Sequence, residues 1–355
     1  MRITANMVTM LRIVLMPIPA YLLYRGTSEL FAALIMIIIL GLTDWIDGIM
    51  ARREGPSVLG GLLDPIADKI FIATIFLPLT ERGVIPVWMT ACIFARDFIL
   101  TTLRTSLLLR DAPMRTSTLA KFKTAAQMIG IGYVILYLAH SDNPDSAWVW
   151  SLISTPIAFP LGLILYRLFK RKKQGPRSRT LLALMTLALA IRGFLGPELA
   201  IIISLWFITA MTVVSGFSYL VDAWSALKGT PGNSKELLLF FLDGLLVPVS
   251  LVLLLGRYDA PGMSALIILI VTLELTVGGL GNLLGSQKIA PRYRWMAFKS
   301  LLQVGLAAAA LALWYFDIQT TLPIGEACIV AATVTTSIYV GIAFWRHRAV
   351  YISAI

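Results

Sequence analysis

Apolar stretches of about twenty residues recur along the whole chain, separated by short segments rich in charged residues, glycine and proline. An α-helix of about 20 residues spans the hydrocarbon core of a bilayer. The pattern therefore predicts an all-α integral membrane protein of about twelve spans. We expect those of the first half at residues 7–24, 29–51, 66–80, 86–108, 121–139 and 148–166. We expect those of the second half at residues 181–195, 200–226, 239–255, 262–284, 296–315 and 324–345.

The composition agrees with a membrane protein and argues against a soluble domain. Of the 355 residues, 58 % are hydrophobic, and the formal net charge is +11. The basic residues gather at the predicted helix ends on one side, as the positive-inside rule requires, so topology explains the charge better than nucleic-acid binding does. We expect a multi-pass protein of the cell (inner) membrane with both termini on the cytoplasmic side.

Four aspartates interrupt the apolar pattern: Asp44, Asp47, Asp64 and Asp68. Carboxylates are costly at the boundary of a membrane, and there they indicate a functional site. The first two are three residues apart and the last two are four apart, so each pair shares one face of a helix. The glycine and proline of segment 53–57 are expected to turn the chain back between the pairs. The sequence thus predicts two antiparallel helices that direct four carboxylates into one cleft on the cytoplasmic side.

Four neighbouring carboxylates repel one another and need positive charge. Mg²⁺ or Mn²⁺ prefers oxygen ligands and would supply that charge. Two such ions could hold a phosphoryl group during an in-line displacement. Gly48 and Gly61 would let a ligand approach the helices closely, and Arg52 is suited to a phosphate oxygen.

The combination of these aspartates with Gly48, Ala51, Arg52 and Gly61 resembles the signature of the CDP-alcohol phosphotransferase family. The resemblance implies a membrane enzyme that transfers a phosphatidyl group from CDP-diacylglycerol to an alcohol and releases CMP. It implies that Asp68 is a metal ligand and also the general base. The other implied metal ligands are Asp44, Asp47 and Asp64. The implied CDP-binding residues are Gly48, Ala51, Arg52 and Gly61.

The acceptor site is predicted from basic residues further along the first half. The pair Arg96-Asp97, the run Lys121-Phe-Lys123-Thr and the opening segment 6–17 resemble the phosphatidylglycerophosphate synthase branch of the family. Glycerol 3-phosphate is therefore the expected acceptor. The branch usually has Glu where this chain has Asp97, so inositol phosphate, serine or another alcohol stays open. The predicted acceptor-binding residues are Arg96, Arg104, Lys121 and Lys123.

The second half aligns in places with the first, which indicates an internal repeat. Residues 216–227 align with 41–52, residues 242–247 with 63–68, and residues 297–303 with 121–127. Of the four acids, the second copy keeps only Asp222 and Asp243.

We therefore expect a catalytic domain at residues 1–166, a basic cytoplasmic linker at 167–179 and a degenerate repeat at 180–355. The two six-helix bundles would form an internal pseudo-dimer that replaces a homodimer. An unrelated second membrane domain is the alternative for residues 180–355.

Two other classes of function stay open at this point. A twelve-span chain of two halves is also typical of transporters, which bind substrate near the bilayer midplane. A lipid-binding protein derived from the enzyme is the second alternative. The crowding of the acids in one half, near predicted cytoplasmic helix ends, favours the enzyme.

Overall fold

The structure is a computed structural model. It describes residues 4–25, 27–55, 58–109, 118–139, 197–227, 238–239, 242–255, 257–258, 262–289, 293–316 and 322–349. The expected spans 148–166 and 181–195 and the linker 167–179 lie outside these residues.

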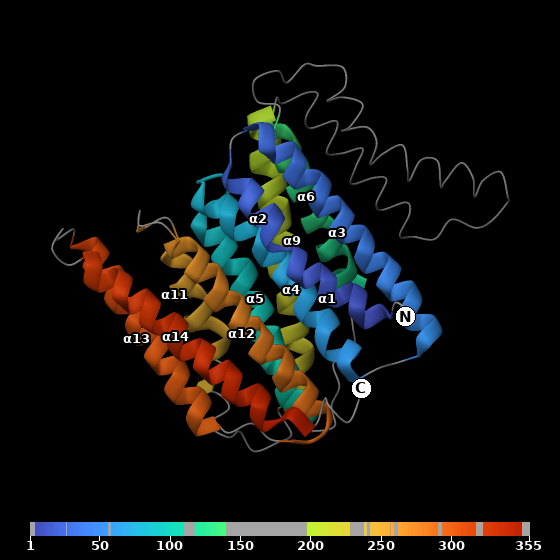
Figure 1. Ribbon diagram of the computed structural model, residues 1–355, viewed down its shortest axis with the longest axis vertical. Coiled ribbons are helices and arrows are strands. Elements are labelled where there is room, and N and C mark those ends of the chain that lie inside the picture. The colour runs from blue at the N-terminus through green and yellow to red at the C-terminus, as the bar shows by residue number, and fades with distance from the viewer. Residues whose placement is uncertain are drawn as a thin grey trace.

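The described residues form helices and no strand, which confirms the all-α prediction (Figure 1). In the first half they are α1 (Ala5–Leu15), α2 (Pro17–Tyr24), α3 (Thr27–Glu54), α4 (Val58–Glu81), α5 (Val87–Leu109) and α6 (Thr118–Ala139). Further on they are α9 (Pro197–Leu227), the π-helix η1 (Leu242–Leu246), α11 (Val247–Leu253), α12 (Met263–Ser286), α13 (Tyr293–Tyr315) and α14 (Leu322–Arg346).

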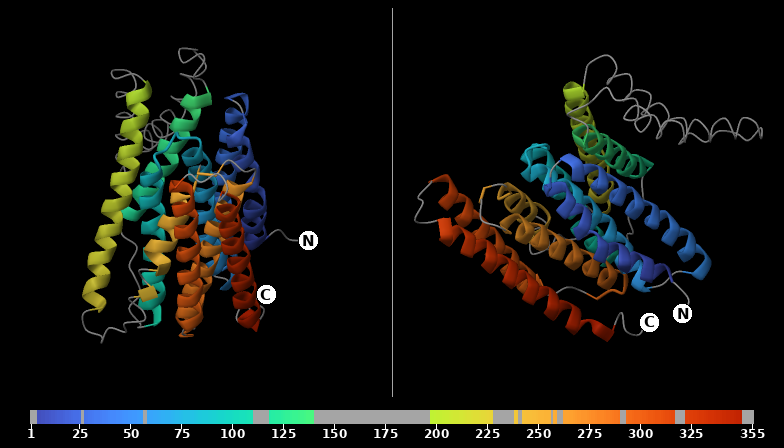
Figure 2. Two further views of the ribbon diagram at one scale, coloured as in Figure 1. Left: turned by 90° about the vertical axis from the view of Figure 1, so that its left-hand side faces the viewer. Right: turned by 45° about the horizontal axis from the view of Figure 1, so that its top comes forward.

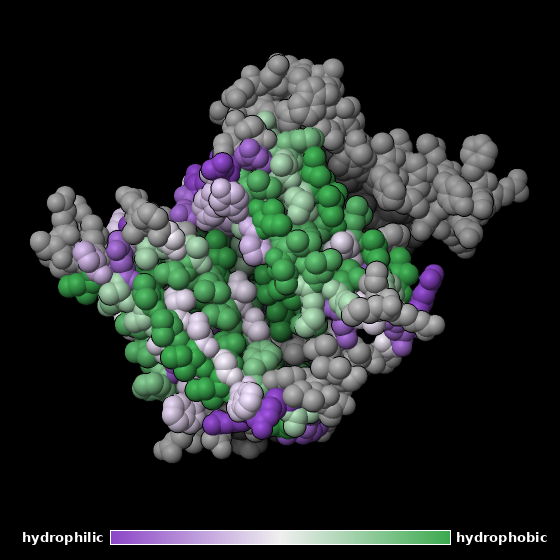
Figure 3. Space-filling view, viewed as in Figure 1, coloured by the Kyte–Doolittle hydropathy of each residue, from purple (hydrophilic) through white to green (hydrophobic). Residues whose placement is uncertain are grey.

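Six helical segments in the described ranges are long and apolar enough to cross a membrane. They are Ala5–Tyr24, Glu29–Glu54, Ile201–Val221, Ala265–Ser286, Trp295–Tyr315 and Pro323–Arg346. The coloured part of the face in Figure 3 is mostly hydrophobic, and hydrophilic residues gather near its edges. Such a surface suits lipid, so the chain is a multi-pass membrane protein.

The first expected span, at residues 7–24, consists of two helices rather than one. α1 ends at Leu15, and Pro17 begins α2. Proline lacks a backbone N–H and is tolerated in the first turn of a helix, which explains why the break falls there.

The predicted reversal after the first aspartate pair is confirmed. α3 ends at Glu54 and α4 begins at Val58, with Gly55 at a φ of +93° that favours glycine. α4 begins earlier than the expected residue 66, so Asp64 lies within the helix. In the described part of the chain, α3 and α4 are bridged by α1, which packs against both.

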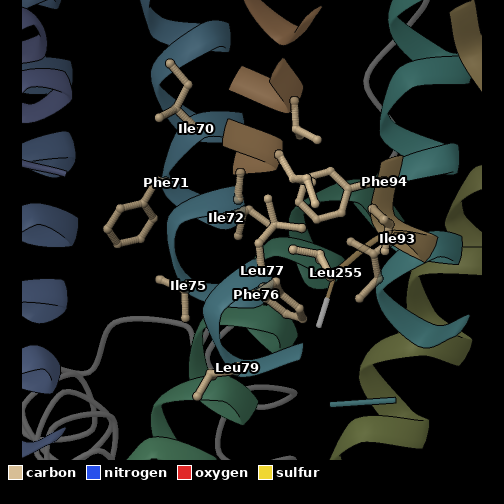
Figure 4. Close-up of a cluster of buried hydrophobic side chains, with 14 of the residues drawn as sticks. Ile70, Phe71, Ile72, Ile75, Phe76, Leu77, Leu79, Ile93, Phe94 and Leu255 are labelled. Carbon is tan, nitrogen blue, oxygen red and sulfur yellow. The ribbon is translucent and has the colours of Figure 1, made fainter. Parts of the chain in front are cut away.

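α4 is the central helix of the described bundle. It packs against α1, α2, α5 and α12, and every residue from Ile70 to Thr80 is buried. Figure 4 shows its apolar side chains beside Ile93 and Phe94 of α5 and Leu255 of the segment after α11. A helix segment that is apolar on all sides belongs in the interior. The aspartates of α4, Asp64 and Asp68, lie before this segment.

Small residues allow α12 to pack closely on α5. A Cβ atom on Gly278 would lie 2.7 Å from Thr101 Cγ2, and one on Gly285 would lie 3.1 Å from the Thr105 carbonyl oxygen. Thr105 also donates a hydrogen bond to Asn282 Oδ1 at 3.0 Å. Close approach through small residues and a side-chain hydrogen bond is typical of helix packing in membranes.

α9 packs against α5 and α6, and α14 packs in the same way against α12 and α13 (Figure 2). One hydrogen bond repeats at these contacts. Gln127 of α6 donates to Thr212 of α9 at 3.2 Å, and Gln303 of α13 donates to Thr336 of α14 at 2.6 Å. α9 therefore has the same relation to the first-half helices that α14 has to α12 and α13. The internal pseudo-dimer itself stays a prediction.

Candidate active site

Arg12 of α1 connects three of the four predicted metal ligands. Its side chain is only 3 % exposed. Its Nη1 forms an ion pair with Asp44, and its Nη2 lies 3.7 Å from Asp68 Oδ1 and 3.9 Å from Asp47 Oδ2. Acids from α3 and from α4 thus face one buried guanidinium.

Thr9, one turn earlier in α1, contacts the fourth carboxylate. Its hydroxyl lies 3.0 Å from Asp47 Oδ2 and 3.4 Å from Asp64 Oδ1, and it can donate to either. The N-terminus of α1 is also anchored to α3, because the Ala5 N–H donates to Glu54 Oε2 at 3.1 Å. Arg12 and Thr9 together bring Asp44, Asp47, Asp64 and Asp68 into one site.

The site is closed on one side and open on the other. The Asp47 side chain is 7 % exposed, whereas that of Asp44 is 52 % exposed and that of Asp68 is 63 % exposed. Arg12 and Asp47 therefore lie at the buried bottom of the site, whereas Asp68 lies where a substrate can reach it.

The charge in this site is unbalanced. The site holds four carboxylates and one buried guanidinium, which pairs with three of them, and arginine keeps its proton in proteins. The Nε and Nη2 atoms of Arg12 are buried and, within the described residues, have no hydrogen-bond partner. Arg12 thus compensates only part of the negative charge, and the site favours further cations.

The donor set suits a hard divalent cation, because carboxylate oxygens are the preferred ligands of such ions. In the described ranges, however, no three acidic, histidine or cysteine side chains lie close enough together to hold one ion. The guanidinium of Arg12 lies among the carboxylates instead. The residues present fit a metal by chemistry, and binding would require the carboxylates to draw together.

The predicted CDP-binding residues lie beside the acids on α3 and α4. A Cβ atom on Gly48 would meet only Arg52 Nη1, at 3.7 Å, and one on Gly61 would meet nothing within 4 Å. Arg52 is exposed and Ala51 is half-buried. The neighbouring Gly60 is buried, and sequence reasoning did not include it among the residues near the acids. It precedes Asp64 by four residues, as Asp64 precedes Asp68, so these three share one face of α4.

The two predicted acceptor residues whose side chains the structure describes are not brought together. Arg96 and Arg104 both lie on α5 but are eight residues, or about 12 Å, apart along the helix. Arg96 pairs with Asp97 at 2.6 Å, whereas Arg104 is exposed. Lys121 and Lys123 lie on α6, and their side chains are outside the described part of the chain.

Lys69 connects the acidic cluster to the helix that carries Arg96. It directly follows Asp68, and its Nζ donates a hydrogen bond to Thr101 of α5. Thr101 lies five residues from Arg96, about 7.5 Å along the helix. α5 is therefore tied, more than one turn beyond Arg96, to the part of α4 that carries Asp68.

A second polar cluster lies in the second half, and it is buried. Lys299 Nζ lies 2.5 Å from Glu274 Oε2 and 3.6 Å from Asp243 Oδ1. Ser300 donates to Asp243, and Gln303 donates to Glu274 Oε1 at 2.6 Å. Asp243 is the residue aligned with Asp64, but its partner is an internal lysine. The side chain of Asp222 lies outside the described residues.

The structure is a membrane-embedded helical bundle with four carboxylates in one site, two of which are exposed. Such a site is typical of an intramembrane enzyme that binds charged groups. Comparison with known proteins identifies the family. Residues 2–164 match the sequence profile described as CDP-alcohol phosphatidyltransferase. No solved structure was found to match the chain.

Several relatives carry names that state a reaction. The chain is 32 % identical to the CDP-diacylglycerol--glycerol-3-phosphate 3-phosphatidyltransferase of Bacillus subtilis, over 37 % of this chain and 76 % of that protein. It is 36 % identical to the protein of the same name from Pseudomonas fluorescens, over 42 % of this chain and 76 % of that protein. It is 33 % identical to a probable phosphatidylglycerophosphate synthase of Mycobacterium tuberculosis, over 38 % of this chain and 66 % of that protein.

The chain belongs to the CDP-alcohol phosphatidyltransferase family. It is a transferase of phospholipid synthesis and is similar to phosphatidylglycerophosphate synthases. Family members generally use divalent metal ions. The matched region ends at residue 164, so α9 to α14 lie outside it.

Sequence reasoning did not assign Arg12 and Thr9 to the site, although both stand in the opening segment that resembles the synthase branch. A signal was available for Arg12. It is an ionisable residue inside an apolar span, and such residues usually pair with another charge.

Replacing Arg12 by Gln should make the protein less stable without divalent ions, because the carboxylates lose their buried cation. Breaking a buried ion pair typically costs about 3–5 kcal/mol. Added Mg²⁺ should then raise the melting temperature more than it does in the wild type. Thermal unfolding in detergent, with EDTA and with Mg²⁺, measures both effects. Arg25→Gln, at the exposed end of α2, is the matched control. An Arg12→Gln protein with the wild-type melting temperature and Mg²⁺ response would contradict the counter-ion role.

The buried cluster of the second half gives a stability prediction. Lys299→Met should lower the melting temperature strongly, because Glu274 and Asp243 lose their shared cation. Adding Glu274→Gln to that variant should recover part of the loss, since it removes one uncompensated charge. Thermal unfolding of both single variants and of the double variant measures the coupling. Simple addition of the two single effects would mean that the ion pair contributes nothing to stability.

Proposed function

We propose that the protein transfers the phosphatidyl group of CDP-diacylglycerol to glycerol 3-phosphate and releases CMP. The observation that carries this proposal is the group of four carboxylates held by Arg12 and Thr9, with Asp68 on the open side. The names of the relatives support the choice of donor and acceptor.

Asp44, Asp47, Asp64 and Asp68 are the residues that would hold divalent metal, two Mg²⁺ or Mn²⁺ ions by our proposal. Bound metal would supply positive charge to the phosphoryl group during transfer. Arg12 keeps the acids of α3 and of α4 in one place, and Thr9 orients Asp47 and Asp64 by hydrogen bonding.

Asp68 is the proposed general base. Its exposed carboxylate takes the proton of the acceptor hydroxyl as that oxygen attacks the phosphorus next to the diacylglycerol. One P–O bond forms to the acceptor, and the P–O bond to the phosphate of CMP breaks. The electron pair of the broken bond leaves with CMP.

The donor nucleotide is proposed to lie along α3 and the start of α4. Open space beside Gly48 and Gly61 leaves room for it, and the exposed Arg52 offers charge-assisted hydrogen bonds to a phosphate. Ala51 and the buried Gly60 have small side chains or none, so the neighbouring helix surfaces also leave room for the nucleotide.

The acceptor phosphate is proposed to bind near Arg96, with Arg104, Lys121 and Lys123 as further cations. Asp97 lies 2.6 Å from Arg96 and balances its charge while no acceptor is bound.

We also propose that the site and both termini face the cytoplasm, because basic residues gather at the helix ends on that side. Residues 1–166 form the catalytic domain in this proposal, and residues 180–355 are a non-catalytic partner that takes the place of a second subunit.

The acceptor prediction is tested with purified protein in detergent, CDP-diacylglycerol and Mg²⁺. Glycerol 3-phosphate, inositol 1-phosphate, inositol and serine are offered separately, and CMP release is measured. We expect turnover with glycerol 3-phosphate. Turnover only with another alcohol would leave the enzyme class intact and overturn the acceptor assignment.

Asp68→Asn should reduce CMP release by at least about 100-fold, the scale of general-base catalysis. Asn has nearly the same size but cannot take the proton. Asp243→Asn is the control from the second half, and its turnover per folded molecule should stay within about twofold of wild type. Near-normal turnover by Asp68→Asn would contradict its role as the base.

A further inference from the structure

Arg96 is held in place by a helix that lies outside the family match. The matched region ends at residue 164, whereas α9 begins at Pro197 and packs along α5. Arg96 Nη2 donates a hydrogen bond to Ser215 Oγ of α9 at 3.2 Å. Its guanidinium carbon lies 5.9 Å from the centre of the Tyr219 ring, which adds a cation–π contact.

Gly216 fixes how closely α9 approaches Arg96. A Cβ atom at this position would lie 2.7 Å from Arg96 Cγ, which is too close for a real contact. The near atom belongs to the stem of the arginine and not to its mobile end. Any side chain at residue 216 would therefore displace Arg96 or push α9 away from α5.

The Ser215 side chain is oriented by a hydrogen bond within α9. It is fully buried, and its hydroxyl is placed to donate to the Thr212 carbonyl oxygen at 2.9 Å. The Thr212 hydroxyl in turn accepts a hydrogen bond from Gln127 of α6 at 3.2 Å. The position of Arg96 thus depends on α9 as well as on its own helix, and α9 is itself hydrogen-bonded to α6.

The guanidinium is oriented but not consumed by these contacts. Nη1 bonds to Asp97 at 2.6 Å and Nη2 to Ser215 at 3.2 Å, while an arginine side chain has five N–H donors. Nε is buried without a hydrogen-bond partner in the described part of the protein, and the side chain keeps 14 % exposure. Donors therefore remain for an anion, in a geometry that Ser215 and Asp97 determine.

We propose that Ser215 and Gly216 of α9 are positioning residues for the acceptor site, and that they set the orientation in which Arg96 meets the acceptor phosphate. This inference rests on the proposed function, because it takes Arg96 as part of the acceptor site. It gives the C-terminal part of the chain a direct part in substrate selection. The bond from Lys69 to Thr101 joins α5 to the α4 segment that carries Asp68, at a point about 7.5 Å along α5 from Arg96.

The test is a pair of substitutions on α9, Ser215→Ala and Gly216→Ala, assayed by CMP release. Each should raise the KM for glycerol 3-phosphate about tenfold, because a hydrogen bond to a charged group is lost or the arginine is displaced. The KM for CDP-diacylglycerol should stay within about twofold of wild type. Gly341→Ala on α14 is the matched control, since a Cβ atom there meets nothing within 4 Å.

The outcomes separate this inference from the proposed function. No CMP from the wild type with glycerol 3-phosphate would overturn the proposed function, and with it this inference. A wild type that is active, with variants whose KM values for both substrates are unchanged, would overturn the positioning role alone. The positioning role is also overturned if both KM values rise equally or only the melting temperature falls, since either result indicates a merely structural contact. If Ser215→Ala does not fold, Gly216→Ala decides the question by the same comparison.

Discussion

The ion pairing of Arg12 with acids from two helices is the interaction on which the site depends. α3 and α4 are consecutive in the chain, but α1 packs between them. Without a cation on α1, carboxylates from both helices would face each other in a low-dielectric setting. One buried guanidinium reduces that repulsion and still leaves negative charge for metal. The packing of α1 between α3 and α4 therefore determines where the positive charge of the site lies.

The helix periodicity predicted the parts of the site that depend on local spacing. Intervals of three and four residues placed Asp44 with Asp47 and Asp64 with Asp68, and the turn at Gly55 joined the two pairs. Arg12 could not be placed in the same way, because its contacts span 32 to 56 residues of sequence and depend on how α1 packs. The all-helical membrane fold followed from apolar length alone, whereas the break at Pro17 and the π-turns of η1 depend on local backbone bonding.

The place of α9 shows where sequence alignment reached its limit. Its end aligns with the aspartate segment of α3, yet its contacts with α5 and α6 match those of α14 with α12 and α13. The repeated bond from a glutamine to a threonine supports the second comparison. Packing of this kind depends on small residues such as Gly216, whose shape matters only against a particular neighbour. A sequence pattern records the small residue but not the neighbour.

The two polar clusters of the chain differ in how their charge is satisfied, and this difference separates a reactive site from a structural one. In the second half, Lys299 lies between two carboxylates, and the cluster is closed to solvent. The lysine, both carboxylates and Ser300 are paired with one another within the protein, so the cluster stabilises the contact among η1, α12 and α13. In the first half, three carboxylates pair with Arg12 and the fourth lies beside Thr9, and two of the four are more than half exposed. Such an arrangement is costly by itself and becomes favourable when a cation and a phosphate group enter. The uncompensated negative charge of the first half is thus available to bind a cation and a substrate. The helices of the second half can pack against this site without having uncompensated carboxylates of their own.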